Sequence, residues 1–266
     1  MKDRIVSCVV LIAIVILSLF ISPVTRVLFF AVCGIMCCYE LSRNFERMEI
    51  YCCAWVMYTY IAAQAVLTMF SAGLTAFIAC CVAAVYLALF SGILNPKVSG
   101  KGALYTLAGV IYPGLLFALL MQISVCRIWM EVMIIACLAT WTCDACALFG
   151  GKKWGKHKVA PHVSPNKTVE GCICGAVSSL AAGAVSWLIL KSFNPYPLWV
   201  CLTASFIASS MGQIGDLSES LIKRMIGIKD FSDLIPGHGG MFDRADSLLF
   251  SIPTKPTIAQ AFTCEE

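Results

Sequence analysis

The chain is 266 residues long; 60% of its residues are hydrophobic, 13% are charged, and the formal net charge is +4. Soluble domains have about 45–50% apolar and about 25% charged residues, and a soluble fold could not bury this much apolar surface. The composition therefore excludes a soluble enzyme, a disordered chain and a fibrous protein. It predicts an all-α, polytopic integral membrane protein with about eight to nine transmembrane helices of ~20 residues.

The apolar runs follow one another closely along the chain. The first, 5–21, follows Lys2 and Arg4 and is not followed by a small-residue cleavage site, so we expect a retained helix rather than a signal peptide. Further spans are predicted at residues 27–39, 51–70, 72–94, 103–123, 129–149, 172–190 and 198–214. We expect two regions: N-terminal transmembrane helices over 1–130, and a second transmembrane region over 131–266 with long polar segments at 150–170 and 215–240.

The distribution of Lys and Arg predicts the orientation. With the N-terminus in the cytoplasm, fourteen of these residues fall on the cytoplasmic side and three on the opposite side. Both long polar segments are therefore expected to face the cytoplasm.

The sixteen cysteines are interpreted as small hydrophobic residues, because most of them lie in apolar runs. Cys143 and Cys146 form a single C-x-x-C without the second pair that a zinc site requires. No metal or redox role is assigned to them.

Carboxylates gather in and just after the second polar segment, next to apolar sequence. If the helix through Asp216 continues, Asp216, Ser220 and Lys223 share one of its faces. Asp243 and Asp246 are one turn apart on a helix expected after the preceding glycines. Carboxylates in such positions are costly and usually mark a functional site. Because oxygen ligands without a His/Cys set favour Mg²⁺, we predict Asp216, Asp243 and Asp246 as metal ligands, and leave a second cation open.

Cations and glycines accompany these carboxylates. Lys223, Arg224 and Lys229 can complement phosphate oxygens. The glycine loop at 236–240 can bring backbone N–H groups to an anion at a helix N-terminus. Together, these features suggest phosphoryl or nucleotidyl transfer.

Structural interpretations of the same residues remain open. Asp243 could only complement the helix dipole, and Asp216 could be a buried ion-pair partner. Ser164-Pro165 is typical of a helix start. Other polar groups are given simple roles: the lysine run 152–158 as an interfacial anchor, His157 and His162 as solvated loop residues, and Glu40 as an interfacial charge.

Residues 220–246, S-L-I-K-R-M-I-G-I-K-D-F-S-D-L-I-P-G-H-G-G-M-F-D-R-A-D, closely resemble the signature of phosphatidate cytidylyltransferases, also called CDP-diacylglycerol synthases. The stretch from Asp144 to Gly171 looks like the other block of that family. We call residues 220–246 the signature segment. The resemblance covers roughly residues 140–250 and makes the second region the catalytic one.

The resemblance implies transfer of CMP from CTP to phosphatidic acid, which yields CDP-diacylglycerol and pyrophosphate. It implies catalytic roles for Asp216, Lys223, Arg224, Lys229, His238, Asp243, Arg244 and Asp246. It also implies substrate-binding roles for Asp144, Ser164, Lys167, Thr168, Ser220, Gly237, Gly239 and Gly240. The expected partners are CTP, phosphatidic acid and the bilayer of a bacterial inner membrane, with no nucleic acid; a homodimer is left open.

The chain departs from the family pattern at its end. Only residues 247–252 follow Asp246 before Pro253, so the last helix is expected to be shortened. Two rival functions are kept: a CTP-dependent lipid-alcohol kinase, which would transfer the γ-phosphoryl group, and a transporter for an anionic solute. The specific signature argues against the first, and the absence of an internal repeat argues against the second.

Overall fold

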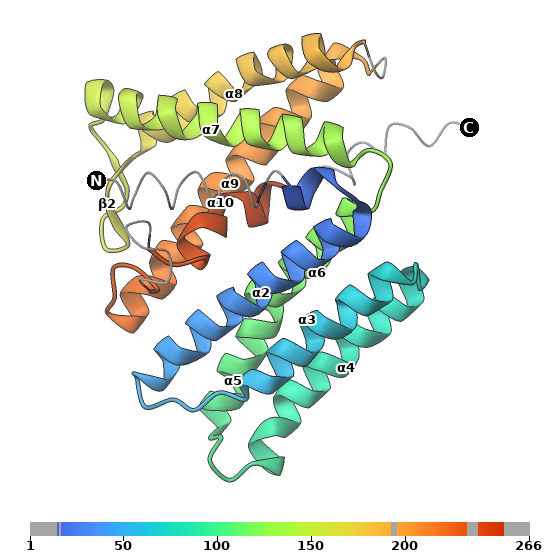
Figure 1. Cartoon of the computed structure of the whole chain (residues 1–266). Helices are drawn as coiled ribbons and strands as arrows, with labels where there is room; N and C mark the ends of the chain where they lie inside the picture. Colours follow the sequence, from blue (N-terminus) through green and yellow to red (C-terminus); the bar gives the residue numbers. More distant parts are fainter. Residues whose placement is uncertain (1–14, 16, 193–195, 233–238, 253–266) are drawn as a thin grey trace, which may run out of the picture. The chain divides into compact units, whose positions relative to one another are not determined.

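A computed structural model describes residues 15, 17–192, 196–232 and 239–252 of the chain (Figure 1). These residues are predominantly helical and include one small hairpin of two strands. Two compact units can be distinguished. Unit 1 takes the described residues of Met1–Cys126 and Ile226–Arg244, and unit 2 takes those of Arg127–Met225 and Ala245–Glu266. The first boundary lies close to the expected 130/131, but most of the signature segment belongs to unit 1.

Unit 1 contains the helices of the N-terminal half. They are α2 (Pro23–Glu46), α3 (Ala54–Met69), α4 (Gly73–Leu94), α5 (Gly100–Gly109) and α6 (Leu116–Ser124), with a π-helical segment η1 (Val110–Leu115) between the last two. Helix α2 begins with a capping box on Ser22 and Pro23 at its first position. Pro113 within η1 interrupts the regular helix, so the predicted span 103–123 forms three helical pieces.

Large side chains from α2, α3 and α6 fill the interior of unit 1: Leu41, Phe45, Met57, Ile61, Phe117 and Met121 are all almost fully buried. Phe231 and Phe242 of the signature segment are buried with ring centroids 4.7 Å apart, and Phe242 lies 5.1 Å from the ring of Tyr112. Aromatic packing therefore anchors the signature segment in this unit.

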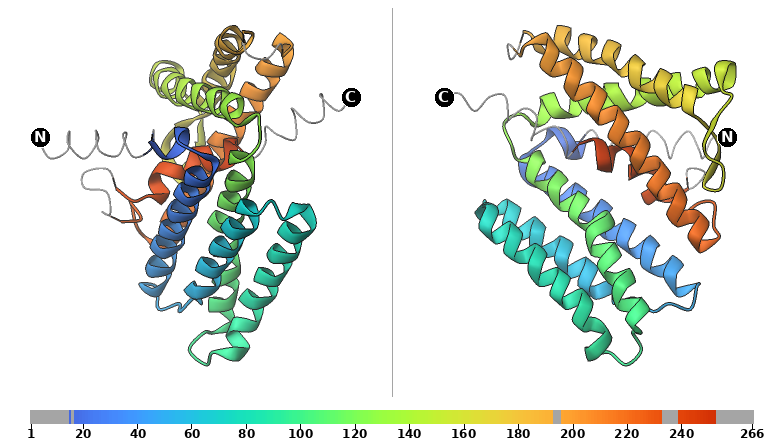
Figure 2. Two further views of the ribbon diagram at one scale, coloured as in Figure 1. Left: turned by 45° about the vertical axis from the view of Figure 1, so that its right-hand side comes forward. Right: turned by 180° about the vertical axis from the view of Figure 1, so that it is seen from behind.

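The described part of unit 2 consists of three long helices, a hairpin and most of a short helix. The helices are α7 (Trp129–Trp154), α8 (Val169–Leu190) and α9 (Leu198–Ile226), and the hairpin pairs β1 (Lys158–Ala160) with β2 (Ser164–Thr168) in antiparallel register. Helix α10 (Phe242–Ser251) begins in unit 1 and continues into unit 2. Helices α7 and α8 run side by side in each view of Figure 2.

Small residues permit this close packing. A Cβ atom at Gly175 of α8 would lie 2.8 Å from the Cys143 sulfur of α7, and one at Gly183 would lie 2.8 Å from the Cys201 carbonyl oxygen of α9. Small residues at helix contacts are typical of membrane proteins. All of the described cysteines are free thiols, and six of them are buried, in agreement with an interpretation of these six as small packing residues.

Within the described residues, six helices are long and apolar enough to cross a membrane, so the all-α polytopic membrane class is confirmed. They are α2, α4, α5 to α6 taken as one, α7, α8 and α9. The expected number of eight to nine is not confirmed: most of the run 5–21 lies outside the described residues, α3 has 16 residues, and α10 has 10. Helix α9 has 29 residues because the first part of the predicted polar segment 215–240, residues 215–226, continues it.

Candidate active site

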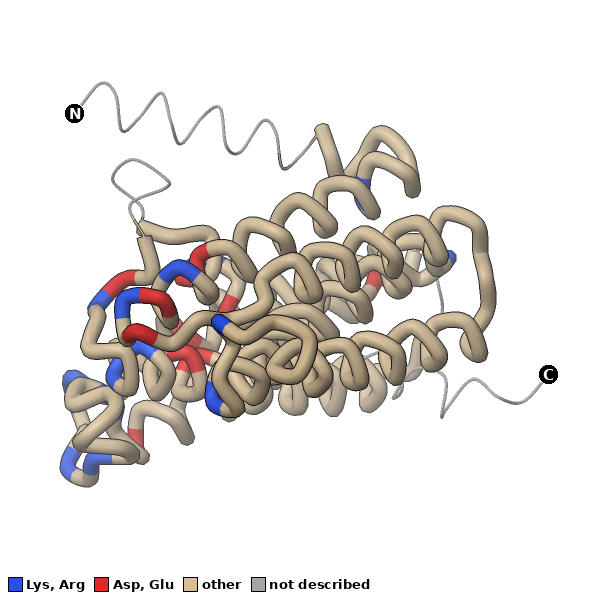
Figure 3. The backbone as a smooth tube through the Cα atoms, turned by 90° about the horizontal axis from the view of Figure 1, so that it is seen from below, with Lys and Arg blue, Asp and Glu red and all other residues tan. Residues whose placement is uncertain are grey.

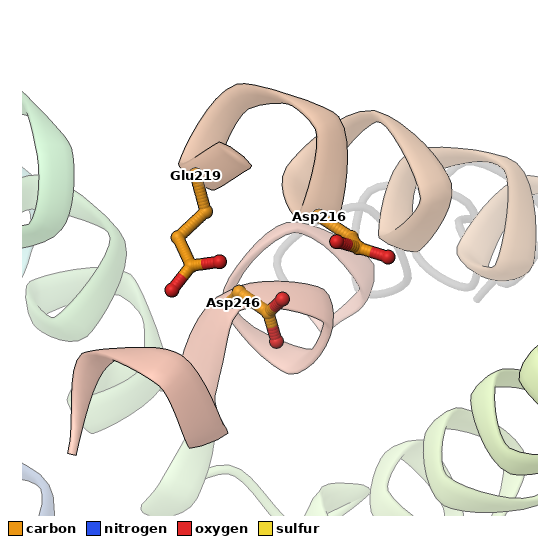
Figure 4. Close-up of side chains that lie close together, drawn as sticks. All are labelled: Asp216, Glu219 and Asp246. Carbon is orange, nitrogen blue, oxygen red and sulfur yellow. The ribbon is translucent and has the colours of Figure 1, made fainter. Parts of the chain in front are cut away.

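Three carboxylates meet in unit 2. Asp216 and Glu219 lie on consecutive turns of α9, and Asp246 comes from α10; each offers an oxygen within 4.8 Å of the others. Figure 4 shows the three side chains close together, two on α9 and one on α10. The condition set for Asp216, Ser220 and Lys223 to share a helix face is met, because α9 continues to Ile226, and this continuation brings Glu219 to the site. Glu219 was missed, although its i, i+3 spacing from Asp216 could have revealed it.

Each α9 carboxylate has a lysine beside it. Lys167, from β2, forms an ion pair with Asp216. Lys223 Nζ lies 2.7 Å from Glu219 Oε2, one turn further along α9, and Glu219 is 1% exposed. The sequence placed Lys167 and Lys223 near substrate phosphates, and the structure places both at the carboxylates. The site therefore holds three carboxylates and two ammonium groups in one small volume.

Asp246 shows the electrostatic effect of this crowding. Burial, and to a smaller extent the nearby charge of Asp216, raises the pKa of Asp246 to about 6. Three close oxygen donors that are incompletely neutralised by lysines fit a hard divalent cation such as Mg²⁺. The donor set Asp216, Glu219 and Asp246 differs from the predicted set by Glu219 in place of Asp243.

A cavity of about 690 Å³ opens beside the carboxylates within unit 2. Its volume is in the range of small-molecule sites. The residues that line it come from α7, the hairpin, α8 and α9, and they include Asp144, Lys152, Lys158, Asn166, Lys167, Thr168, Gln213 and Asp216. Figure 3 shows charged positions gathered at helix ends and connections while the helices themselves are almost free of charge. The cavity thus combines one acidic side with several lysines.

The hairpin that carries Lys167 corrects an expectation. Ser164-Pro165 does not start a helix, because Ser164 to Thr168 form β2 and α8 begins five residues later. Thr168 is the N-cap of α8 and accepts a hydrogen bond of 3.2 Å from the Gly171 amide. Its side chain thus caps the helix. Direct substrate contact by Ser164 and Thr168 stays a prediction.

Asp243 and the glycines before it organise a loop in unit 1. Asp243 Oδ2 accepts hydrogen bonds from the Phe231 amide at 2.9 Å and the Gly240 amide at 3.0 Å. Gly239 has a φ of +83°, and a Cβ atom at Gly240 would lie 2.8 Å from Glu40 Oε2. Only glycine fits both positions without strain. The substrate-binding role of these glycines and the metal role of Asp243 stay predictions.

Glu40 contradicts its interpretation as an interfacial charge. It is 1% exposed within α2, and its carboxylate accepts hydrogen bonds from Ser232 Oγ at 2.5 Å, the Met241 amide at 2.9 Å and the Phe242 amide at 2.9 Å. The amides expected to receive a phosphate at the start of α10 are therefore occupied by a carboxylate of the protein. No local sequence pattern indicates this, because the partners are about 200 residues apart.

The remaining predicted residues are less constrained. Arg224 is exposed and its Nε donates to the Val163 carbonyl at 3.2 Å, while Lys229 and Arg244 are exposed and Ser220 is half-buried on α9. Gly237 and His238 lie outside the described residues. His157 is exposed, as expected, with Nδ1 2.6 Å from Glu170 Oε1, and His162 is also exposed.

Known proteins match this sequence over most of its length. A sequence model of the cytidylyltransferase family matches residues 2–262. The phosphatidate cytidylyltransferase of Staphylococcus saprophyticus is 39% identical over 157 residues, 59% of this chain and 59% of the relative. That of Bacillus subtilis is 40% identical over 144 residues, 54% of this chain and 53% of the relative, and that of Staphylococcus haemolyticus is 43% identical over 124 residues, 47% of each chain. The aligned parts thus span about half the length of these curated relatives. Because the family model matches nearly the whole chain, the chain belongs to the cytidylyltransferase family.

Proposed function

We propose that this chain is a phosphatidate cytidylyltransferase, which joins CTP and phosphatidic acid to CDP-diacylglycerol and pyrophosphate. Membership of the cytidylyltransferase family and relatives of that name support this reaction. A phosphate oxygen of the lipid would attack the α-phosphorus of CTP. One P–O bond forms there as the bond between the α-phosphorus and the bridging oxygen breaks, and pyrophosphate leaves with that oxygen.

One observation carries the proposal: the carboxylates of Asp216, Glu219 and Asp246 meet beside a cavity that also contains lysines. The attacking phosphate is already anionic, so the reaction needs no strong base. It needs positioning of two anions and neutralisation of the charge that develops on pyrophosphate. Carboxylates that can hold a cation, adjacent to lysines that can contact phosphates, are suited to both tasks.

The residues of unit 2 divide these tasks. Asp216, Glu219 and Asp246 would hold Mg²⁺, which supplies positive charge to the triphosphate when bound. Lys167 and Lys223 neutralise two of these carboxylates and can exchange partners to contact phosphate oxygens when substrate enters. Lys152 and Lys158 also line the cavity and would attract the nucleotide. A second cation remains part of the proposal for this crowded site.

We also infer the cellular setting from the charge distribution. The chain would lie in a bacterial inner membrane with the polar segments 150–170 and 215–240 facing the cytoplasm, where CTP is present. In a Cys-depleted background, Lys156→Cys and Lys229→Cys should react with an impermeant thiol reagent only when the inner side is accessible. Labelling in intact cells would contradict this orientation. Whether the chain forms a homodimer can be tested by measuring the mass of the purified protein in detergent.

The direct test is turnover of radiolabelled CTP with phosphatidic acid by the purified chain. We expect labelled CDP-diacylglycerol and one pyrophosphate for each lipid converted, with turnover dependent on Mg²⁺ and independent of any ion gradient. Release of CDP with a phosphorylated lipid alcohol would instead identify a kinase. Gradient-dependent solute uptake without chemical conversion would identify a transporter.

A further inference from the structure

A second polar cavity lies in unit 1, at the C-terminal end of α2. Its volume is about 470 Å³. One wall comes from the last turns of α2 and the residue that caps it, and the other from the start of the loop in the signature segment; the lining residues are Tyr39, Glu40, Arg43, Arg47, Asp230, Phe231 and Ser232. All of these residues belong to unit 1, and Asp216, Glu219 and Asp246 are not among them.

Two arginines give the cavity its positive side. Arg43 and Arg47 are four residues apart, so they lie on one face of the helix, where like charges repel each other. Among the described residues, no ion pair within 4.0 Å joins either guanidinium group to a carboxylate. Arg47 Nη1 instead donates to Asn44 Oδ1 at 2.9 Å, which holds this arginine against α2. Both guanidinium groups thus keep donors available for an anion.

The acidic residues of the cavity do not neutralise the arginines. The carboxylate of Glu40 is already engaged by a hydroxyl and two amides of the signature segment. Asp230 is exposed at the opposite wall. Two guanidinium groups one helical turn apart can both donate hydrogen bonds to one phosphate, since each offers a planar pair of N–H donors.

The cavity is also connected to the signature segment. Asn44 lies between the two arginines in the sequence, and its Nδ2 donates to the Phe231 carbonyl at 2.7 Å. Phe231 is 1% exposed and its amide binds the carboxylate of Asp243. An anion held by Arg43 and Arg47 would therefore lie near the backbone of the signature segment at Phe231, which these hydrogen bonds hold in place.

We propose that this cavity binds a substrate phosphate group through Arg43 and Arg47. The proposal deepens the proposed function and rests on it for the identity of the substrate. Phosphatidic acid and CTP both carry suitable phosphates. The position favours the lipid, because α2 has the length and composition of a membrane span and lipid phosphates lie at the ends of such spans.

A simpler role must be distinguished from binding. Arginines at the C-terminal end of a helix interact favourably with its dipole and with anionic membranes. Lys97 and Lys101 provide the matched control, since they are exposed cations of the same unit, in and just after the connection between α4 and α5. Removing their charges changes the net charge by the same amount but leaves the cavity intact.

The experiment compares Arg43→Gln/Arg47→Gln with Lys97→Gln/Lys101→Gln in the full chain in mixed micelles. Apparent KM values are measured separately for phosphatidic acid and for CTP. We expect the arginine variant to raise the KM for phosphatidic acid at least about tenfold, because it loses charge-assisted hydrogen bonds, while the KM for CTP and the control variant change little. A rise in the KM for CTP alone would support a phosphate site but assign it to the nucleotide. Unchanged KM values for both substrates, or equal changes in the control, would overturn the site.

Two further measurements keep the result interpretable. Arg43→Gln alone leaves the contact between Arg47 and Asn44 in place, so it should show a smaller rise in KM with an unchanged melting temperature. Binding of phosphatidic acid, with diacylglycerol as the phosphate-free comparison, is measured by native mass spectrometry without CTP. If the wild-type chain binds phosphatidic acid in preference to diacylglycerol, and Arg43→Gln/Arg47→Gln loses that preference, the site stands even where turnover of CTP fails. Equal binding by both proteins would refute the site independently of the enzymatic function.

Discussion

The carboxylate of Glu40 accepts a hydrogen bond of 2.9 Å from the backbone amide of Phe242, which lies 202 residues further along the chain. Helix α10 begins at Phe242, so a side chain from α2 occupies one of the amides that a helix leaves without an intrahelical partner. The same carboxylate also binds Met241 and Ser232. Glu40 is thus a buried cap that fixes the signature segment within unit 1.

Removal of this cap should destabilise the protein. Glu40→Ala leaves two backbone amides without their acceptor in a buried site, at a cost of about 1–3 kcal/mol for each group. We expect a lower melting temperature in detergent and a loss of turnover. Glu46→Ala is the control, because Glu46 is an exposed acidic residue on the same helix. Equal melting temperatures for both variants would show that Glu40 does not hold the loop.

The carboxylates of unit 2 should respond to magnesium as a group. Glu219→Gln, Asp216→Asn and Asp246→Asn each remove one anionic oxygen donor with little change of shape. We expect each variant to need at least about tenfold more Mg²⁺ for half-maximal turnover, or to lose activity, because a lost ligand weakens cation binding. Glu49→Gln, at an exposed position outside the site, should leave the Mg²⁺ titration unchanged. A wild-type titration curve for Glu219→Gln would remove Glu219 from the ligand set.

Lys223 and Arg224 should behave differently although they are neighbours. Lys223 pairs with Glu219, which is 1% exposed, so Lys223→Ala should lower both turnover and stability; breaking a buried pair typically costs about 3–5 kcal/mol. Arg224 is exposed, and Arg224→Ala should reduce kcat/KM with little change in melting temperature. The comparison requires kinetics and thermal melts on the same preparations. Identical melts for the two variants would contradict the buried pairing.

Sequence patterns predicted the parts of this molecule that depend on local chemistry. Apolar runs located most of the spanning helices, and the shared face expected for Asp216 and Lys223 if their helix continued is present, because α9 runs to Ile226. The i, i+3 spacing of Asp243 and Asp246 likewise placed both on α10. These features depend on helical periodicity, which a sequence carries directly.

Features that depend on tertiary contacts were not predictable in this way. Glu40 resembles a charge at the end of an apolar run until Met241 and Phe242 are seen to donate to it. Ser164-Pro165 resembles a helix start, but pairing with β1 takes these residues into a strand and moves the N-cap to Thr168. In both cases a partner distant in space determines the role of a residue.

Gly215 provides a test of the packing that positions Asp246. A Cβ atom at Gly215 would lie 2.7 Å from the Asp246 carbonyl oxygen and 2.8 Å from the ring of Phe250. Gly215→Ala should therefore push α10 away from α9 and reduce turnover strongly, since overpacking typically costs about 1–3 kcal/mol. Gly100→Ala is the control, because a Cβ atom there meets nothing within 4 Å. Turnover and melting temperature of both variants decide the outcome; wild-type turnover of Gly215→Ala would show that the close approach is not needed.

Two substitutions of Asp243 can distinguish a structural role of the signature segment from a chemical one. One of its oxygens, Oδ2, accepts from both the Phe231 and Gly240 amides. In Asp243→Asn the amide oxygen can accept the same two hydrogen bonds, so the loop should persist and the melting temperature should stay near that of the wild type. In Asp243→Ala the acceptor of both hydrogen bonds is lost, and the melting temperature should fall.

If the charge of Asp243 also serves the reaction, as its place in the signature predicts, Asp243→Asn should lose most turnover despite its intact fold. A weakened response to Mg²⁺ would identify a metal ligand. Turnover across a Mg²⁺ titration, beside thermal melts of both variants, makes the distinction. Wild-type turnover in Asp243→Asn, together with a destabilised Asp243→Ala, would restrict Asp243 to organising the loop.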